Sequence, residues 1–204
     1  MKCAYKIISI IIISAINHYC YGQQDTSVTT PPKLDFHYES SFKITDEDGV
    51  KVYRRKRDNK KPTGYIKFDC LGDGEGSSSE GLFQNGKKHK RWLVKICNDA
   101  TRYEINYDMG IMNGRYKVYI SLTQKKDTVF YETTFTNGTG IWKDFHSNGD
   151  IKEVGEYKSN KKEGEWLIYD KGNILCEKWY YENGISVKME RIELPPGYFR
   201  ESKY

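Results

Sequence analysis

Apolar and polar residues alternate in short runs along most of this chain. Aromatic and aliphatic residues stand two apart in segments such as Tyr103-Ile105-Tyr107. A period of two places these side chains on one face of a β-strand. The segments are separated by turns that contain Asn-Gly, a pair that adopts the positive φ of tight hairpins at low cost. These turns are Asn85-Gly86, Asn113-Gly114, Asn137-Gly138 and Asn183-Gly184. The pattern therefore predicts consecutive β-hairpins rather than helices.

One segment of this pattern repeats. Gly140-Ile141-Trp142-Lys143-Asp144-Phe145 returns further along the chain as Gly164-Glu165-Trp166-Leu167-Ile168-Tyr169. Weaker copies start at Gly64, Lys90 and Gly114, so the interval between successive starts is almost constant. Self-similarity at such a period is typical of repeat proteins, and an isolated hairpin is barely stable. We therefore expect an all-β fold, an elongated single-layer antiparallel sheet of about five stacked hairpins.

The repeat has anchor positions whose roles can be predicted. The aromatic anchors, which we expect to form a ladder across the strands, are Trp92, Tyr116, Trp142 and Trp166. The glycine anchors, which we expect to let a neighbouring ring or backbone approach closely, are Gly64, Gly114, Gly140 and Gly164. Lys90 replaces the glycine in one copy, where we expect a distortion. Trp142 and Phe145 are an odd number of residues apart, which predicts either two covered faces or a β-bulge.

The ends of the chain differ from the repeats. Residues 1–22 resemble a cleaved signal peptide, with Lys2 and Lys6 before an apolar run too short to span a membrane, and small residues before Gln23. Lipidation of Cys20 is the alternative, although the preceding residues lack the leucine and small residues of a lipobox. We expect a flexible linker at 23–33, an N-terminal cap at 34–52, the repeat array at 53–190 and a C-terminal cap or tail at 191–204. The predicted location is secreted or periplasmic, without a transmembrane segment.

The net charge of the chain bears on which partners it could bind. The net charge is +5, and removal of residues 1–22 leaves 31 basic and 28 acidic residues, a net charge of +3. This excess is too small to indicate a nucleic-acid-binding protein. Basic residues recur at turns and could bind an anionic envelope surface, a glycan or an acidic partner; the alternative is that they are solvated turn residues. The basic candidates for partner binding are Arg54, Arg55, Arg57, Lys87 and Lys88.

The repeated segments resemble a known family. Phe83-Gln84-Asn85-Gly86-Lys87-Lys88-His89 with Trp92, and Tyr157 through Gly164-Glu165-Trp166-Leu167-Ile168-Tyr169, are similar to the MORN-variant repeat. The resemblance extends over about residues 50 to 190. It implies a single layer of antiparallel hairpins and a role in interactions rather than catalysis. Bacterial members of this family are often described as antitoxin components, and proteins with ordinary MORN repeats are associated with membranes, phosphoinositides and scaffolding.

Candidate chemistry is sparse. Cys70 and Cys97 follow their anchors by similar distances and could form a disulfide, or they could be idle thiols like Cys176. The histidines lack metal-ligand spacing, and no nucleophile–base pair stands out. We therefore expect no catalytic residue, no metal site and no cofactor.

Three functions follow from these observations. The first is a non-enzymatic exported module that binds a protein or envelope partner through its hairpin surface. The second is an antitoxin or immunity-type inhibitor of a toxin or effector, as the family resemblance implies. The third, an envelope enzyme, has no residue constellation in its favour.

Overall fold

The computed structural model describes residues 35–37, 39–70, 76–97, 99, 101–120, 129–195 and 198. The chain divides into the units Met1–Pro32 and Lys33–Tyr204, and every described residue belongs to the second. The expected signal peptide at 1–22, the linker at 23–33 and most of the expected C-terminal tail lie outside the described residues.

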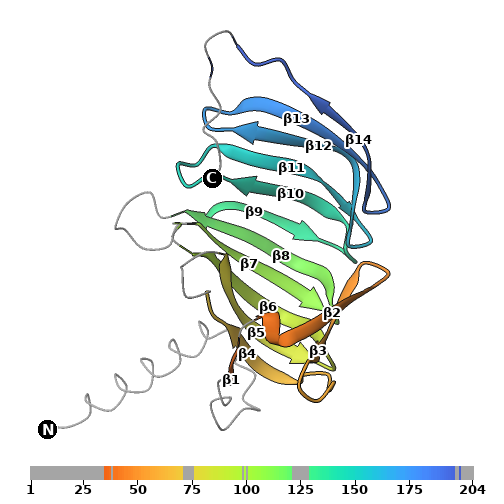
Figure 1. The fold of residues 1–204 in the computed structure, drawn as a ribbon. Coiled ribbons are helices and arrows are strands. Elements are labelled where there is room, and N and C mark those ends of the chain that lie inside the picture. The colour runs from red at the N-terminus through yellow and green to blue at the C-terminus, as the bar shows by residue number, and fades with distance from the viewer. Residues whose placement is uncertain are drawn as a thin grey trace, which may run out of the picture. The chain divides into compact units, whose positions relative to one another are not determined.

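The described residues are almost entirely β-strands (Figure 1). The helical turn that they contain is η1, a 3-10 helix at Glu39–Ser41. In chain order the strands are β1 (Asp35–His37), β2 (Phe42–Glu47), β3 (Val50–Arg55), β4 (Gly64–Phe68), β5 (Ser77–Gln84), β6 (Lys87–Ile96), β7 (Thr101–Asp108), β8 (Ile111–Ile120), β9 (Val129–Phe135), β10 (Gly140–Phe145), β11 (Ile151–Lys158), β12 (Lys161–Asp170), β13 (Ile174–Glu182) and β14 (Ile185–Arg191).

The strands form three sheets, not the single layer expected from the sequence. Their orders are β1-β4-β5-β6-β7-β8-β9, β10-β11-β12-β13-β14 and β2-β3. Strands that are consecutive in the chain pair antiparallel within each sheet, whereas β1 pairs with β4 in parallel. The prediction of an all-β fold with antiparallel, hairpin-like strands is confirmed, and the prediction of one continuous layer is wrong.

The break between the two larger sheets lies at the turn from β9 to β10. Thr136 and Thr139 form an isolated bridge there, instead of the ladder seen in the other hairpins. Across the break, the rings of Tyr116 and Trp142 stack with centroids 4.4 Å apart, and the Phe145 ring packs on Phe130 at 5.0 Å. Packing of large rings thus takes the place of ladder hydrogen bonds, and one hydrophobic cluster includes residues of both sheets.

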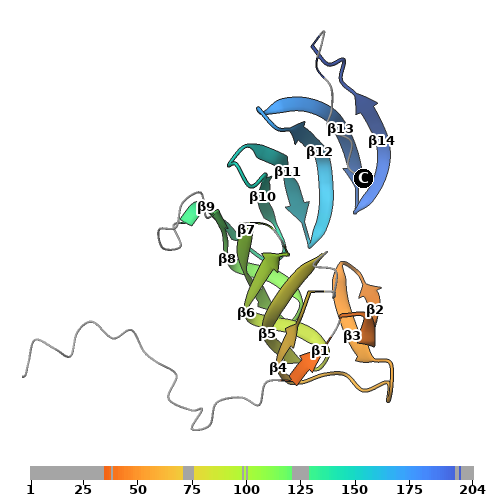
Figure 2. The same ribbon diagram turned by 60° about the vertical axis from the view of Figure 1, so that its left-hand side comes forward.

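The hairpin β2–β3 forms the third sheet and packs against the beginning of the seven-stranded sheet (Figure 2). Phe42 and Tyr53 of the hairpin join Phe68, Phe83 and Trp92 in a buried cluster. The backbone amide of Tyr53 donates a hydrogen bond of 2.8 Å to the carbonyl of Gly86. The expected end of the N-terminal cap at residue 52 falls inside β3.

Asn160, in the turn between β11 and β12, ties this hairpin to a distant part of the chain. Its side-chain amide donates to the carbonyls of Gly49 at 3.0 Å and Gly110 at 2.8 Å, and its side-chain oxygen accepts from the amide of Met112 at 2.8 Å. Next to it, the Lys161 ammonium lies 2.5 Å from the Asp48 carboxylate. The tip of β2–β3 is therefore bonded to the β11–β12 turn, which is itself bonded to Gly110 and Met112 of the seven-stranded sheet.

Successive hairpins are also joined at their turns. The turn glycines donate backbone hydrogen bonds to the strand that follows the preceding turn: Gly110 to Lys88 at 2.7 Å, Gly138 to Met112 at 2.8 Å and Gly184 to Lys162 at 2.9 Å. The expected turn at Asn113-Gly114 is wrong, because both residues lie inside β8 and the chain turns at Met109-Gly110, with φ +46° and +90°.

The glycine anchors act through their backbone conformation rather than through close approach. Gly64, Gly114 and Gly164 have φ of +110°, +105° and +66°, and a Cβ added at Gly64 or Gly164 would meet no atom within 4 Å. Gly114 and Gly164 lie where the register of their hairpins shifts. Lys90 lies at the same kind of shift with φ +58°. At Lys90, Gly114 and Gly164 the anchor position is thus a β-bulge with positive φ, a conformation that glycine adopts most easily.

Gly140 is the exception among the glycine anchors. Its φ is not positive, and a Cβ there would lie 3.0 Å from the Phe135 ring and the Thr134 carbonyl. The odd spacing of Trp142 and Phe145 also has its explanation, since the β10–β11 register shifts between Asp144 and Phe145.

Candidate binding surfaces

The four aromatic anchors lie on one side of the strands, here called the ring face, but they do not form one continuous ladder. Trp92, Tyr116 and Trp166 are fully buried, and Trp142 is partly buried. Tyr116 stacks on Trp142, whereas Trp92 belongs to the cluster beneath the hairpin β2–β3. Trp166 contacts Tyr157 at 5.2 Å, with the rings at 90°. These buried rings stabilise the fold, so a partner could contact only the side chains that surround them on the ring face.

Two glycines outside the anchor set explain how the tryptophans fit. A Cβ at Gly81 would lie 2.5 Å from the Trp92 ring, and a Cβ at Gly155 would lie 2.2 Å from the Trp166 ring. In both units the indole N–H donates to the carbonyl after the glycine, from Trp92 to Leu82 at 3.0 Å and from Trp166 to Glu156 at 3.1 Å. The spacing from glycine to tryptophan is the same in both units, and this recurrence in the sequence was the available signal for the motif.

A lysine four residues before each of these tryptophans lies over its indole ring. The Lys88 ammonium is 4.4 Å from the Trp92 ring centroid, and the Lys162 ammonium is 3.7 Å from that of Trp166. Such cation–π contacts favour a charged lysine at an aromatic surface. The Lys88 side chain thus lies on the ring face and lines a cavity, and it is not one of the solvated basic residues at the turns.

The other predicted basic residues have different surroundings. Arg55 forms an ion pair of 2.9 Å with Asp58, and Arg57 lies 3.9 Å from the same carboxylate. Arg54 donates to the Asn59 carbonyl at 3.4 Å. Two of the three arginines therefore share one neighbouring carboxylate, which lowers the net charge of this loop.

Lys87 precedes Lys88 on β6, and its Cβ would lie 3.6 Å from a Cβ added at Gly110. The Lys87 side chain is partly buried beside the Met109-Gly110 turn. The structure therefore assigns Lys87 and Lys88 to different environments.

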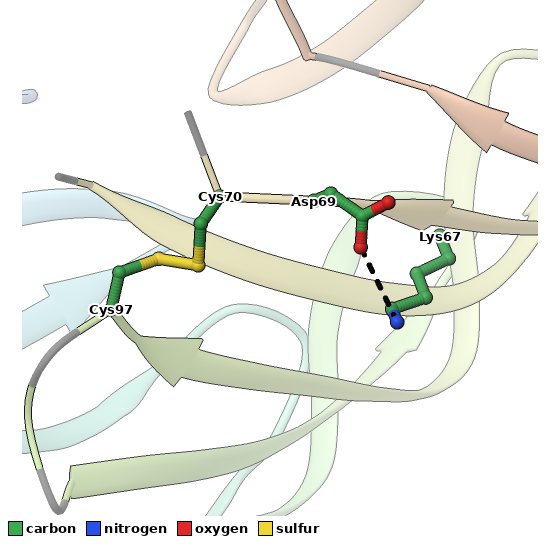
Figure 3. The surroundings of a disulfide bond; sticks show 4 residues. All are labelled: Lys67, Asp69, Cys70 and Cys97. Carbon is green, nitrogen blue, oxygen red and sulfur yellow. Dashed lines mark ion pairs between the residues drawn. A yellow bond between two sulfur atoms is a disulfide. The ribbon is translucent and has the colours of Figure 1, made fainter. Parts of the chain in front are cut away.

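Of the two alternatives for Cys70 and Cys97, the structure shows the disulfide. Cys70 follows β4 and Cys97 follows β6, and their sulfur atoms form a disulfide with Cα atoms 6.2 Å apart (Figure 3). Lys67 and Asp69 form an ion pair of 3.3 Å close to it. The disulfide connects two strands that both pair with β5. Cys176 is buried as a free thiol.

A buried carboxylate connects the two larger sheets. The Tyr103 hydroxyl on β7 donates to the Asp144 carboxylate on β10, and Lys152 lies 3.2 Å from that carboxylate. Burial, and then the charge of Asp144, raise the pKa of Tyr103 above its ordinary value. Tyr103 thus remains a neutral hydrogen-bond donor at physiological pH, and the arrangement is a connection between sheets.

The last strand carries the most exposed apolar side chains of the described residues. Ile185 and Val187 on β14, at 69% and 53%, have the two highest exposed fractions of the large apolar side chains described, and Met189 on the same strand is 39% exposed. Among the described residues β14 pairs only with β13, so its other edge has free backbone groups. Met189 lies opposite Trp179, which lies opposite Trp166, so it extends the ring face to this edge.

Other kinds of site find no support in the part of the chain that the structure describes. It contains no group of three or more histidine, cysteine, aspartate or glutamate side chains that could hold a metal ion. It also contains no helix with the length and hydrophobicity needed to cross a membrane.

The comparisons with family models and with curated proteins found no match. No protein-family model matches the chain, and no curated protein matches its sequence.

Proposed function

We propose that this protein is a non-enzymatic, exported binding module that takes up an extended segment of a protein partner along β14. The observation that carries the proposal is the free edge of β14 together with its exposed apolar side chains. An edge strand of this kind binds another strand by main-chain hydrogen bonds, and pockets between its side chains select the sequence.

The chemistry of β14 favours an apolar partner segment. Soluble proteins commonly protect a free edge with charged or proline residues. In β14 the charges of Lys188 and Glu190 neutralise each other in an ion pair, and Lys188 lies over the Tyr180 ring. Apart from Ser186 and Arg191, the exposed side chains of β14 that remain for contact are apolar.

Two features support export. The first is the signal-like pattern of residues 1–22. The second is the Cys70–Cys97 disulfide, since disulfides persist mainly in oxidising compartments.

The MORN-variant interpretation is part of the same proposal. It is supported by the hairpins joined turn to turn and by the two tryptophan units of identical pairing. An inhibitor of a toxin, the alternative that the family resemblance implies, would differ from this proposal in the identity of the partner and not in the kind of surface.

The test places a photoreactive amino acid at position 187 of the mature protein and exposes it to the native envelope fraction. The matched control carries it at position 141, because Ile141 is also exposed and apolar, at 44%. We expect one protein to crosslink at 187 and not at 141. We also expect Val187→Lys to abolish its capture, while Ile141→Lys, opposite Glu156, retains it.

Equal crosslinking at both positions, or capture that survives Val187→Lys, would contradict the proposal. Crosslinking of the chain to a second copy of itself, with a dimer in size-exclusion chromatography, would also contradict it.

A further inference from the structure

A cavity of about 330 Å³ lies between the hairpin β2–β3 and the ring face. Its walls combine polar residues with four aromatic residues: Tyr53 from the hairpin, Tyr107 from β7, and Trp142 and Tyr157 from the five-stranded sheet. Its volume is near the lower end of the roughly 300–1,000 Å³ that is typical of small-molecule sites. The cavity is thus large enough for a small ring compound and not for a folded partner.

Lys88 brings a positive charge to this aromatic cavity. Besides the Trp92 ring, its ammonium lies 5.9 Å from each of the Tyr53 and Tyr107 rings. No described carboxylate forms an ion pair with it, and Glu39, which lines the same cavity, accepts a hydrogen bond from the Tyr53 hydroxyl at 3.0 Å. Lys51 adds a second ammonium to the lining. The cavity therefore presents an excess of positive charge.

The chain contains a second copy of this arrangement, around Lys162 on β12, that shows what Lys88 lacks. Lys162 also lies over a tryptophan, and it forms an ion pair of 3.3 Å with Glu153. Glu153 pairs with Ile168 in the same register as Ser79 pairs with Val94. Ser79 thus occupies the position of the carboxylate, and it lines the cavity beside Lys88.

Trp142 contributes its ring to the cavity wall. Its indole N–H is buried and has no hydrogen-bond partner among the described residues, whereas the indoles of Trp92 and Trp166 both donate to carbonyls. The Trp142 nitrogen has almost no accessible surface, so a ligand in the cavity would meet the Trp142 ring, and the cationic donor available to an anionic group is Lys88.

We propose that this cavity binds a small aromatic carboxylate, whose carboxylate group lies beside Lys88 as that of Glu153 lies beside Lys162, and whose ring packs among Tyr107, Trp142 and Tyr157. The carboxylate replaces the acidic side chain that Ser79 does not provide. The site is separate from β14 and does not depend on the function proposed for that strand.

The experiment titrates the mature protein with 2-naphthoate and with 2-naphthamide, its uncharged analogue, by isothermal calorimetry. A charge-assisted hydrogen bond contributes about 1.5–3 kcal/mol, so we expect the carboxylate to bind at least about tenfold more tightly than the amide. Lys88→Met, which installs the residue found at the equivalent position 112, should weaken naphthoate binding by a similar factor. Ser79→Glu should do the same by pairing with Lys88 internally.

Lys162→Met is the matched control, because it removes the equivalent lysine from the unit that has its own carboxylate, and it should leave naphthoate binding unchanged. Circular dichroism checks that each variant is folded. The proposal is overturned if the protein does not bind naphthoate at millimolar concentration or binds both compounds equally. It is also overturned if Lys88→Met and Ser79→Glu both bind like the wild type, or if Lys162→Met loses as much affinity as Lys88→Met.

Discussion

The substitution Gly155→Ala tests the packing of the tryptophan units directly. The added Cβ would lie 2.2–2.4 Å from three atoms of the Trp166 ring, closer than real Cβ contacts. Trp166 is fully buried and its indole N–H is bonded to the Glu156 carbonyl, so the ring cannot move aside without losing that bond. The substitution should therefore destabilise the fold.

The magnitude follows from two opposing effects. Overpacking of a close-packed site costs about 1–3 kcal/mol, and the upper end applies because the ring is held on several sides. Replacement of glycine by alanine restricts the unfolded chain, which returns about 0.4–1 kcal/mol. We expect the free energy of unfolding to fall by about 2 kcal/mol, measured by urea denaturation followed by far-UV circular dichroism.

A double-mutant cycle separates this explanation from a general effect at the strand. In a Trp166→Leu background the ring is absent, so Gly155→Ala should cost much less than in the wild type. A loss below about 0.5 kcal/mol in the wild type, or an equal loss in both backgrounds, would refute the reasoning, since surface changes have effects of that size.

Three further predictions concern other contacts. Burial lowers the pKa of Lys88 from 10.5 to about 8, so between these pH values the unfolded state binds more protons than the folded state. The free energy of unfolding should therefore rise from about pH 8 to about pH 10. Lys88→Met should remove this rise, measured as the urea midpoint at each pH. Replacing Cys70 and Cys97, 27 residues apart, by alanine should lower the free energy of unfolding by about 3–4 kcal/mol in the same assay, and a change under 1 kcal/mol would contradict the expected constraint on the unfolded chain. Asn160→Gly keeps the positive φ but removes the acceptor of the Met112 amide, whose hydrogen exchange should become at least about tenfold faster; unchanged exchange would show that this bond contributes little.

Much of the fold follows from local sequence rules, and the exceptions have physical reasons. The alternation of apolar residues predicts the strands because it needs only the neighbouring residues. The three-sheet arrangement depends on the stacking of Tyr116 on Trp142, which belong to different hairpins, and no local pattern specifies that contact. The sequence favours a turn at Asn113-Gly114 over the turn that forms at Met109-Gly110, because Asn-Gly is the better turn pair, but Gly114 instead occupies a bulge of β8.

In the candidate sites, too, some features follow from the local sequence and others depend on contacts between distant parts of the chain. The spacing of Ile185, Val187 and Met189 is visible in the sequence, but their exposure depends on what else covers β14. Lys88 has the sequence context of a solvated turn lysine, next to Lys87 and His89. Its position beside a cavity results from the hairpin β2–β3, which packs on the ring face from far away in the chain.

The bond from Asn160 to Gly49 joins residues 111 positions apart, and this has a consequence for biogenesis. Most other pairings join consecutive strands and are able to form as each hairpin leaves the ribosome. The hairpin β2–β3 emerges early, and its tip finds its final contacts only after β11 and β12 have been made. During that interval the cavity beside the hairpin lacks the wall that Trp142 and Tyr157 later provide, so this is the stage at which a chaperone or a ligand has the freest access to it.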